Sequence, residues 1–365
     1  MAYNVSAETY CFFLFSLLFF SFSFSEAQKV PAMYIFGDSL VDVGNNNHLK
    51  VSLAKANFPH NGVDYPGKKA TGRFSNGKNP ADFLAEKVGL PTSPPYLSVS
   101  NSNNSSVFLA GVSFASGGAG IFNGTDELYR QSIPLPKQVS YYSDVYEALV
   151  QQLGSAAAQD HLSKSVFAVV IGSNDLLGYF NSGSNDRKES TPQQFVDQMV
   201  VNLKAQLKRL HNLGGRKFLV TGTGAIGCCP SQRNQNKTSG ECNEEANYWS
   251  VQYNEGLKSM LQGLKTELQS FSYSYFDAYS VFLNFIQKPA TYGFSEVKAA
   301  CCGLGNLKAE VPCVPISTYC SNRSDHVFWD LYHPTEAAAR IFVDMIFDGS
   351  KQYVNPVNLK QLIAA

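Results

Sequence analysis

Residues 30–40 of the chain read VPAMYIFGDSL. An apolar run of this length that ends in a glycine and two polar residues is typical of a buried strand followed by a turn. We therefore predict a strand over residues Val30–Phe36, with Gly37, Asp38 and Ser39 at its carboxyl end. A Gly-Asp-Ser sequence is more often only a turn, so this stretch alone assigns no chemistry.

Similar apolar runs recur further along the chain, at residues 166–171, 217–221 and 273–277, with a shorter candidate strand at 107–114. Segments with helical periodicity lie among them, at residues 80–88, 193–213, 243–270 and 335–347. This alternation predicts a mostly parallel sheet with helices on both faces. We therefore expect an α/β fold with three α/β/α layers and a five-stranded sheet. Because no composition break marks a linker, we expect residues 28–365 to form a single domain.

Glycine-containing polar segments follow two more of the predicted strands. Gly172-Ser173-Asn174-Asp175 follows the second strand, and Gly222-Thr223-Gly224 follows the third. In open parallel sheets the ligand crevice lies outside the carboxyl ends of the strands. We therefore expect these segments to gather with Ser39 at one edge of the sheet.

A histidine and a carboxylate that could activate a serine lie near the C-terminus. A serine hydroxyl is a poor nucleophile unless a histidine takes its proton and a carboxylate orients that histidine. Of the six histidines, only His333 has a fitting context, with Asp330 three residues before it. Pro334 then begins a helical segment, as proline often does. The alternative interpretation is that Asp330 and Pro334 only cap that helix.

Four short sequences occur in a fixed order along the chain: FGDSL (36–40), FASGGAG (114–120), GSND (172–175) and DLYHP (330–334). Together they resemble the four sequence blocks of the GDSL, or SGNH, hydrolase family. The chain after residue 27 is also similar to the plant GDSL esterase/lipase branch of this family. That similarity includes the stretches VDVGNNN (41–47), TGRFSNG (71–77), ACCG (300–303) and FWD (328–330).

The resemblance implies a flavodoxin-like fold and a secreted serine carboxylic ester hydrolase that forms an acyl-enzyme, with lipid breakdown as one role. Ser39 would be the nucleophile, His333 the general base and then acid, and Asp330 its orienting carboxylate. The oxyanion hole would consist of the backbone N–H groups of Ser39 and Gly118 and the side-chain amide of Asn174. The substrate would be a small acyl ester or a lipid, with no cofactor and no metal.

Three other functions are alternatives to this one. A conventional α/β-hydrolase would need a Gly-x-Ser-x-Gly elbow, which the sequence lacks. A catalytically silent secreted glycoprotein would have lost part of the triad or of the oxyanion hole, yet all of these residues are present. An extracellular acyltransferase on the same triad stays open, because the choice between water and another acceptor depends on the pocket.

The N-terminus predicts export. Residues Cys11–Phe24 form an apolar run that is too short for a comfortable membrane span. Ser25-Glu26-Ala27 then fits a signal peptidase site, although the segment before the run has Glu8 and no basic residue. The alternative interpretation is a membrane anchor or a buried helix. We expect residues 1–27 to be a signal peptide, the mature chain to be secreted and extracellular, and no integral membrane span to remain. The net charge of zero gives no reason to expect nucleic acid as a partner.

Cysteines and glycosylation sequons agree with export. Of eight cysteines, Cys11 leaves with the signal peptide and the others lie between Cys228 and Cys320, where histidines are nearly absent, so disulfides are expected rather than a metal site. Because seven is an odd number, at least one thiol should stay free or pair outside the chain. By the family resemblance, Cys228 pairs with Cys242, the last four pair among themselves, and Cys229 is free. The candidate glycosylation sites are Asn103, Asn104, Asn123, Asn236 and Asn322.

Overall fold

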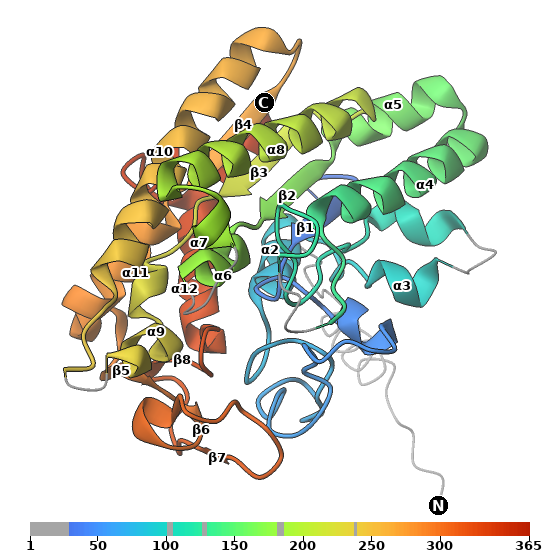
Figure 1. The fold of residues 1–365 in the computed structure, drawn as a ribbon. Helices are drawn as coiled ribbons and strands as arrows, with labels where there is room; N and C mark the ends of the chain where they lie inside the picture. The colour runs from blue at the N-terminus through green and yellow to red at the C-terminus, as the bar shows by residue number, and fades with distance from the viewer. Residues whose placement is uncertain (1–28, 101–104, 126–129, 181–185, 237–238) are drawn as a thin grey trace, which may run out of the picture.

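The computed structural model describes residues 29–100, 105–125, 130–180, 186–236 and 239–365. The predicted signal peptide, residues 1–27, and the sequons at Asn103 and Asn104 lie outside the described residues. A twisted sheet lies at the centre of the described fold, with helices packed on its two faces (Figure 1). No helix in the described ranges is both long and apolar enough to cross a bilayer.

The central sheet has five strands in the order β1-β2-β3-β4-β9. Strands β1 to β4 are parallel, and β9 pairs antiparallel with β4. Every position of β1 and β2 is buried, which explains their continuous apolar sequences. The prediction of a mostly parallel five-stranded sheet is therefore confirmed. The strands are β1 (Met33–Gly37), β2 (Val166–Val170), β3 (Lys217–Thr221), β4 (Ser272–Phe276) and β9 (Val354–Asn355).

The predicted strand at residues 107–114 is wrong. Residues Ser105–Ala110 form a 3-10 helix, η2, and only Ser113 makes a bridge with Ile35 of β1. Between them the chain turns at Gly111, where a Cβ atom would lie 1.9 Å from the Met33 carbonyl oxygen. The short segment still runs parallel to β1 at the edge of the sheet, where a flavodoxin-like fold has the second strand of the chain.

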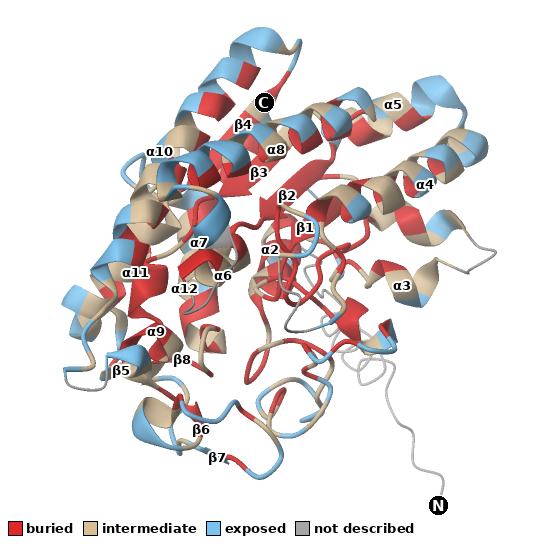
Figure 2. Ribbon diagram, viewed as in Figure 1, coloured by how far each residue is buried: buried red, intermediate tan, exposed pale blue. Residues whose placement is uncertain are grey.

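Helices cover both faces, so the prediction of three layers is confirmed. Side chains alternate along β1: Tyr34 packs into one apolar cluster and Ile35 into the other. Figure 2 shows the buried sheet between helices whose outer surfaces are exposed. The first cluster involves α4 (Leu135–Leu153), α5 (Ser155–Lys164), α6 (Ser173–Phe180), α8 (Pro192–Asn212) and α10 (Glu244–Glu267). The second involves α2 (Pro80–Val88), α11 (Ala278–Gln287), α12 (Glu336–Asp348) and α13 (Leu359–Ala364).

The four predicted helices correspond to α2, α8, α10 and α12, with ends that differ by a few residues at most; the other helices were not predicted. Smaller elements complete the described fold. The short helices are α3 (Tyr96–Val99), α7 (Asp186–Glu189), α9 (Pro230–Gln235), η1 (Asn45–His48), η4 (Ile226–Cys228), η5 (Pro289–Tyr292) and η6 (Asn306–Lys308). The short strands are β5 (Glu296–Ala300), which pairs with β8 (His326–Phe328), and β6 (Cys302–Gly303), which pairs with β7 (Thr318–Tyr319).

The cysteines pair as the family resemblance implied. Cys228 is bonded to Cys242, and the last four cysteines form the Cys301–Cys320 and Cys302–Cys313 bridges. Cys229 is free and buried. The expectation of an unpaired Cys229 is confirmed.

Candidate active site

Ser39 lies in the turn that follows β1, and the local sequence explains how it is held there. A Cβ atom at Gly37 would lie 2.3 Å from the Val170 carbonyl oxygen, so only glycine lets the end of β1 approach β2 this closely. The Gln138 side chain of α4 accepts a hydrogen bond from the Gly37 N–H at 2.8 Å and donates one to its carbonyl at 2.7 Å. Ser39 itself is 8% exposed.

Ser39, His333 and Asp330 form a continuous hydrogen-bonded line. The Ser39 Oγ lies 2.7 Å from the His333 Nε2, although the two residues are 294 positions apart in the chain. On the other side of the ring, the His333 Nδ1 lies 2.7 and 2.8 Å from the two carboxylate oxygens of Asp330. The structure therefore brings together the three residues that the sequence suggested for nucleophilic catalysis.

The loop before α12 holds this histidine through its backbone. Asp330 accepts hydrogen bonds from the backbone N–H groups of Tyr332 and His333, at 3.0 and 2.9 Å. Burial on its own raises the pKa of Asp330, but the facing His333 and these hydrogen bonds outweigh it and bring the pKa below its usual value. The N-cap of α12 is Thr335, whose side chain accepts from the Ala338 N–H. The alternative interpretation, in which Asp330 only caps that helix, is therefore wrong.

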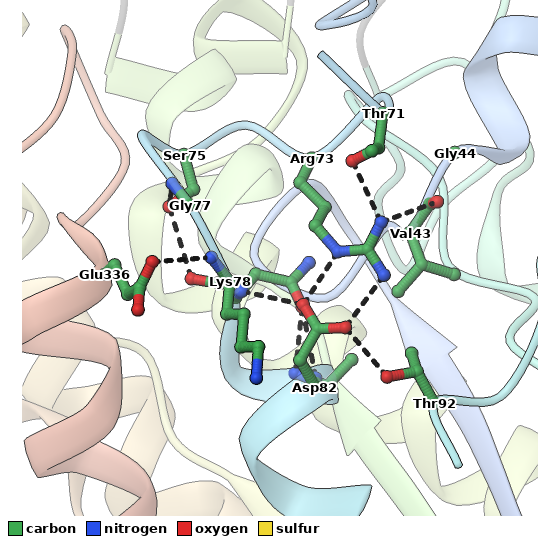
Figure 3. Close-up of polar contacts among 12 residues, drawn as sticks. Val43, Gly44, Thr71, Arg73, Ser75, Gly77, Lys78, Asp82, Thr92 and Glu336 are labelled. Atoms are coloured by element: carbon green, nitrogen blue, oxygen red, sulfur yellow. Dashed lines mark hydrogen bonds and ion pairs between the residues drawn. The ribbon is translucent and has the colours of Figure 1, made fainter. Parts of the chain in front are cut away.

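The ring of Phe74 packs against His333, with 4.9 Å between the ring centroids. In the sequence, residues 71–77 showed only a resemblance to the plant GDSL esterase/lipase branch and no place in the site. Figure 3 shows what holds this stretch: the Arg73 guanidinium makes two hydrogen bonds of 2.7 Å to the Asp82 carboxylate, and the Lys78 N–H donates to Glu336 of α12. The buried pair at the start of α2 thus fixes the loop that supports the histidine ring.

The three predicted oxyanion-hole residues, Ser39, Gly118 and Asn174, line one cavity. Gly118 has a φ of 80°, in the left-handed region that glycine favours. Asn174 lies in the first turn of α6, and its Nδ2 donates to the Ala119 carbonyl oxygen at 2.9 Å. This bond joins the segment that follows β2 to residues 117–121, which we call the glycine loop.

Two buried carboxylates hold the ends of that glycine loop. Asp42 accepts from the Gly117 N–H at 3.0 Å, and Asp175 accepts from the Ile121 N–H at 2.9 Å. Burial raises the pKa of both carboxyl groups to about 6. Burial also raises the pKa of Asp38 to about 7, and its Oδ2 has no hydrogen-bond partner in the described part of the chain. No sign of a role for Asp42 is visible in the sequence, because its bond to Gly117 joins segments 75 positions apart.

The cavity at Ser39 has a volume of about 600 Å³, within the range of small-molecule sites. Part of its lining is a group of apolar side chains from β2, β4, β8, α11 and α12, in which the four phenylalanine rings pack on one another. These residues are Val170, Phe276, Phe282, Phe328, Phe342 and Ile346. Such a lining suits an apolar group bound beside the serine.

The comparisons with known proteins agree with this geometry. The family model described as GDSL-like Lipase/Acylhydrolase matches residues 33–346. GDSL esterase/lipase At5g55050 of Arabidopsis thaliana is 53% identical over 342 residues, which cover 92% of this chain and 90% of the relative. GDSL esterase/lipase At3g50400 of the same plant is 39% identical, covering 95% and 96% of the two chains. A solved structure of an α/β hydrolase from the metagenome of Lake Arreo is 11% identical, and the match covers 87% of this chain and 94% of that one. Its TM-score of 0.37 is too low to support an inference. With its blocks in order and its match across almost the whole chain, this protein belongs to the plant GDSL esterase/lipase branch of the GDSL-like lipase/acylhydrolase family.

Proposed function

We propose that this esterase/lipase cleaves carboxylic esters through an acyl-enzyme on Ser39. The Ser39 Oγ attacks the ester carbonyl carbon while the His333 Nε2 takes its proton, and His333 then gives that proton to the departing alcohol. In the second half, His333 deprotonates a water molecule that attacks the acyl-enzyme. The bond from the acyl carbon to the Ser39 Oγ then breaks, His333 returns the proton to that oxygen, and the carboxylic acid is released. Asp330 orients the imidazole and stabilises the positive charge that forms on it.

The observation that supports this proposal is the line of short contacts from the Ser39 Oγ to the His333 Nε2 and from the Nδ1 to Asp330. A serine and a histidine at hydrogen-bond distance, with the histidine held by a third group, have the arrangement that proton transfer requires. All three residues also line the cavity where a substrate would bind.

The oxyanion would be held by the N–H groups of Ser39 and Gly118 and by the amide of Asn174. A primary amide has two N–H donors, and the contact with the Ala119 carbonyl uses only one of those on Asn174. That contact fixes the amide plane, so the second N–H is available to a developing negative charge without further ordering. Donors fixed in advance in this way are the most effective ones for an oxyanion.

The ester would have an apolar acyl group. The cavity that contains Ser39 is also lined by aromatic and aliphatic side chains from β4, α11 and α12. An acyl chain bound against these side chains would leave its carbonyl at the serine.

Active-site labelling tests the proposal. A fluorophosphonate probe should label Ser39 in the folded protein, and heat-unfolded protein should not react. Ser39→Ala should abolish hydrolysis of a short-chain aryl ester without changing the thermal stability. Labelling of another serine, or wild-type rates in Ser39→Ala, would refute the assignment. Free carboxylic acid as the product, rather than an ester of an added alcohol, would distinguish hydrolysis from acyl transfer.

Residues 28–365 would be a single, secreted domain. Three disulfides support an oxidising compartment, and the family match over residues 33–346 supports one domain. The sequon residues Asn123, Asn236 and Asn322 are exposed, as glycan attachment requires. Secretion from a eukaryotic host should give an N-terminus near Gln28 and glycans at these sites. Retention of residues 1–27 in the secreted chain would contradict the signal-peptide assignment.

A further inference from the structure

One side of the cavity mouth is an exposed segment without charge. Residues 311–322 read VPCVPISTYCSN, with no charged side chain. We call residues Val311–Tyr319 the disulfide rim. Ile316 is 79% exposed, and Val311 and Tyr319 are also exposed. Exposed charges normally keep a solvated loop soluble, so a gathering of exposed apolar side chains without them indicates a contact surface.

The disulfide rim is held in one conformation. Cys313 is bonded to Cys302 and Cys320 to Cys301, so the segment is tied to β6 near both ends. Inside it, the Ser317 side chain donates to the Pro312 carbonyl at 2.8 Å and accepts from the Val314 N–H at 3.1 Å. Because of these bonds, Ile316 cannot easily fold back into the core, and its exposure is a property of the folded state.

A second segment that borders the cavity, residues Val51–Phe58, also exposes apolar side chains, although it contains Lys55. Val51 is 57% exposed and Leu53 is 61% exposed, whereas Ser52 and Ala54 between and beside them are buried. This alternation is that of an extended chain with one face outward, so Val51 and Leu53 point the same way. We call these residues the facing rim.

Both rims border the cavity that contains Ser39. Leu53 and Phe58 line it from the facing rim, and Pro312 and Val314 line it from the disulfide rim. Two residues beyond the end of the facing rim, the ring of His60 lies 5.0 Å from the ring of Tyr319 in the disulfide rim. In Figure 1 the blue loops that follow β1 and the orange lobe of β6 and β7 lie at the same end of the molecule.

We propose that the two rims together form a docking surface for the surface of a neutral or zwitterionic lipid aggregate. The inference rests on the proposed function, because it concerns how an apolar ester reaches Ser39. A protein seated across both rims would close the mouth between them, whereas a lipid surface at this position supplies substrate directly to the cavity. Two charged residues line the cavity at the rims: Lys55 belongs to the facing rim, and Glu310 directly precedes the disulfide rim. Because their charges are opposite, this pair gives an anionic surface no advantage over a neutral one.

Partition onto lipid tests this docking surface. The variants are Val51→Ser and Ile316→Ser, neither of which lines the cavity. The matched control is Val201→Ser, whose side chain is 60% exposed on α8. We expect each rim variant to lower both partition onto phosphatidylcholine vesicles and hydrolysis of emulsified triacylglycerol by about 10-fold. Removal of one aliphatic side chain from water changes an equilibrium constant by about that factor. Hydrolysis of a dissolved short-chain aryl ester should change by less than about twofold.

The outcomes separate this proposal from the catalytic one. Ser39→Ala should bind vesicles as the wild type does, because docking needs no chemistry. A wild-type protein that does not bind vesicles, or an equal loss in Val201→Ser and Ile316→Ser, would overturn the docking surface and leave the role of Ser39 intact. A wild-type dimer in light scattering that Ile316→Ser splits would also overturn it, since the occupant would then be a second copy of this chain.

Discussion

Replacement of Asp330 by Asn should remove most of the catalytic power while leaving the fold in place. The Asn side-chain oxygen can still accept from the Tyr332 and His333 N–H groups, which now bond to Asp330 at 3.0 and 2.9 Å. The new amide group, however, would donate toward the His333 Nδ1. The ring proton would then sit on Nε2, which could no longer accept the Ser39 proton.

The size of the effect can be worked out from the geometry. At the 2.7 Å distance between the His333 Nδ1 and the Asp330 carboxylate, the attraction to an imidazolium is about 6 kcal/mol at an effective dielectric constant of about 20. The same change in another serine hydrolase triad lowers kcat by about 10,000-fold, or about 5.5 kcal/mol. We therefore expect kcat/KM for a soluble aryl ester to fall by about 10,000-fold.

The chain offers a matched control for this variant. Asp325 also contacts a histidine, with its Oδ1 2.6 Å from the His326 Nδ1, but this pair is not among the residues that line the cavity. Asp325→Asn should keep kcat/KM within about twofold of the wild type. Asp330→Asn with a wild-type melting temperature and more than about 1% of the wild-type kcat/KM would refute the orienting role of Asp330.

Further predictions concern the oxyanion hole, the Arg73–Asp82 pair and the buried Asp38. Asn174→Ala should lower kcat by about 100- to 1000-fold with little change in KM, measured on a soluble ester, and a loss below tenfold would remove Asn174 from the oxyanion hole. Arg73→Met leaves the buried Asp82 carboxylate unpaired and should lower the free energy of unfolding in urea by about 3–5 kcal/mol. Arg323→Met, which breaks the more exposed pair with Asp64, should cost less than about 1 kcal/mol, so equal losses would contradict the reasoning. Because burial raises the pKa of Asp38 from 3.8 to about 7, its contribution to stability is present at acid pH and lost as the pH rises toward and through about 7. The melting temperature of Asp38→Asn relative to the wild type should therefore rise between about pH 5 and about pH 8, and a constant difference would contradict the raised pKa.

The sequence by itself determined the features that depend on neighbouring residues. Apolar runs identified β1 to β3, because strands buried on both faces carry mostly apolar side chains. The strand β4 was also predicted, although its sequence SYSYF includes the buried Ser274. The contact of Asp330 with His333 could also be foreseen, because residues three positions apart can lie in one turn and come within hydrogen-bond distance. The order of the sequence blocks pointed to Ser39, Gly118 and Asn174, all of which line one cavity.

Only the tertiary structure decided which distant segments meet. Ser39 reaches His333 across 294 positions, Phe74 supports the histidine ring, and Asp42 holds the Gly117 N–H through packing that no local pattern encodes. The failed strand at residues 107–114 has the same origin, since the turn at Gly111 depends on the approach of Met33. Exposure is also a tertiary property. Ile316 and Leu53 are of residue types common in protein cores, and their sequence neighbours do not reveal that both side chains stay at the surface.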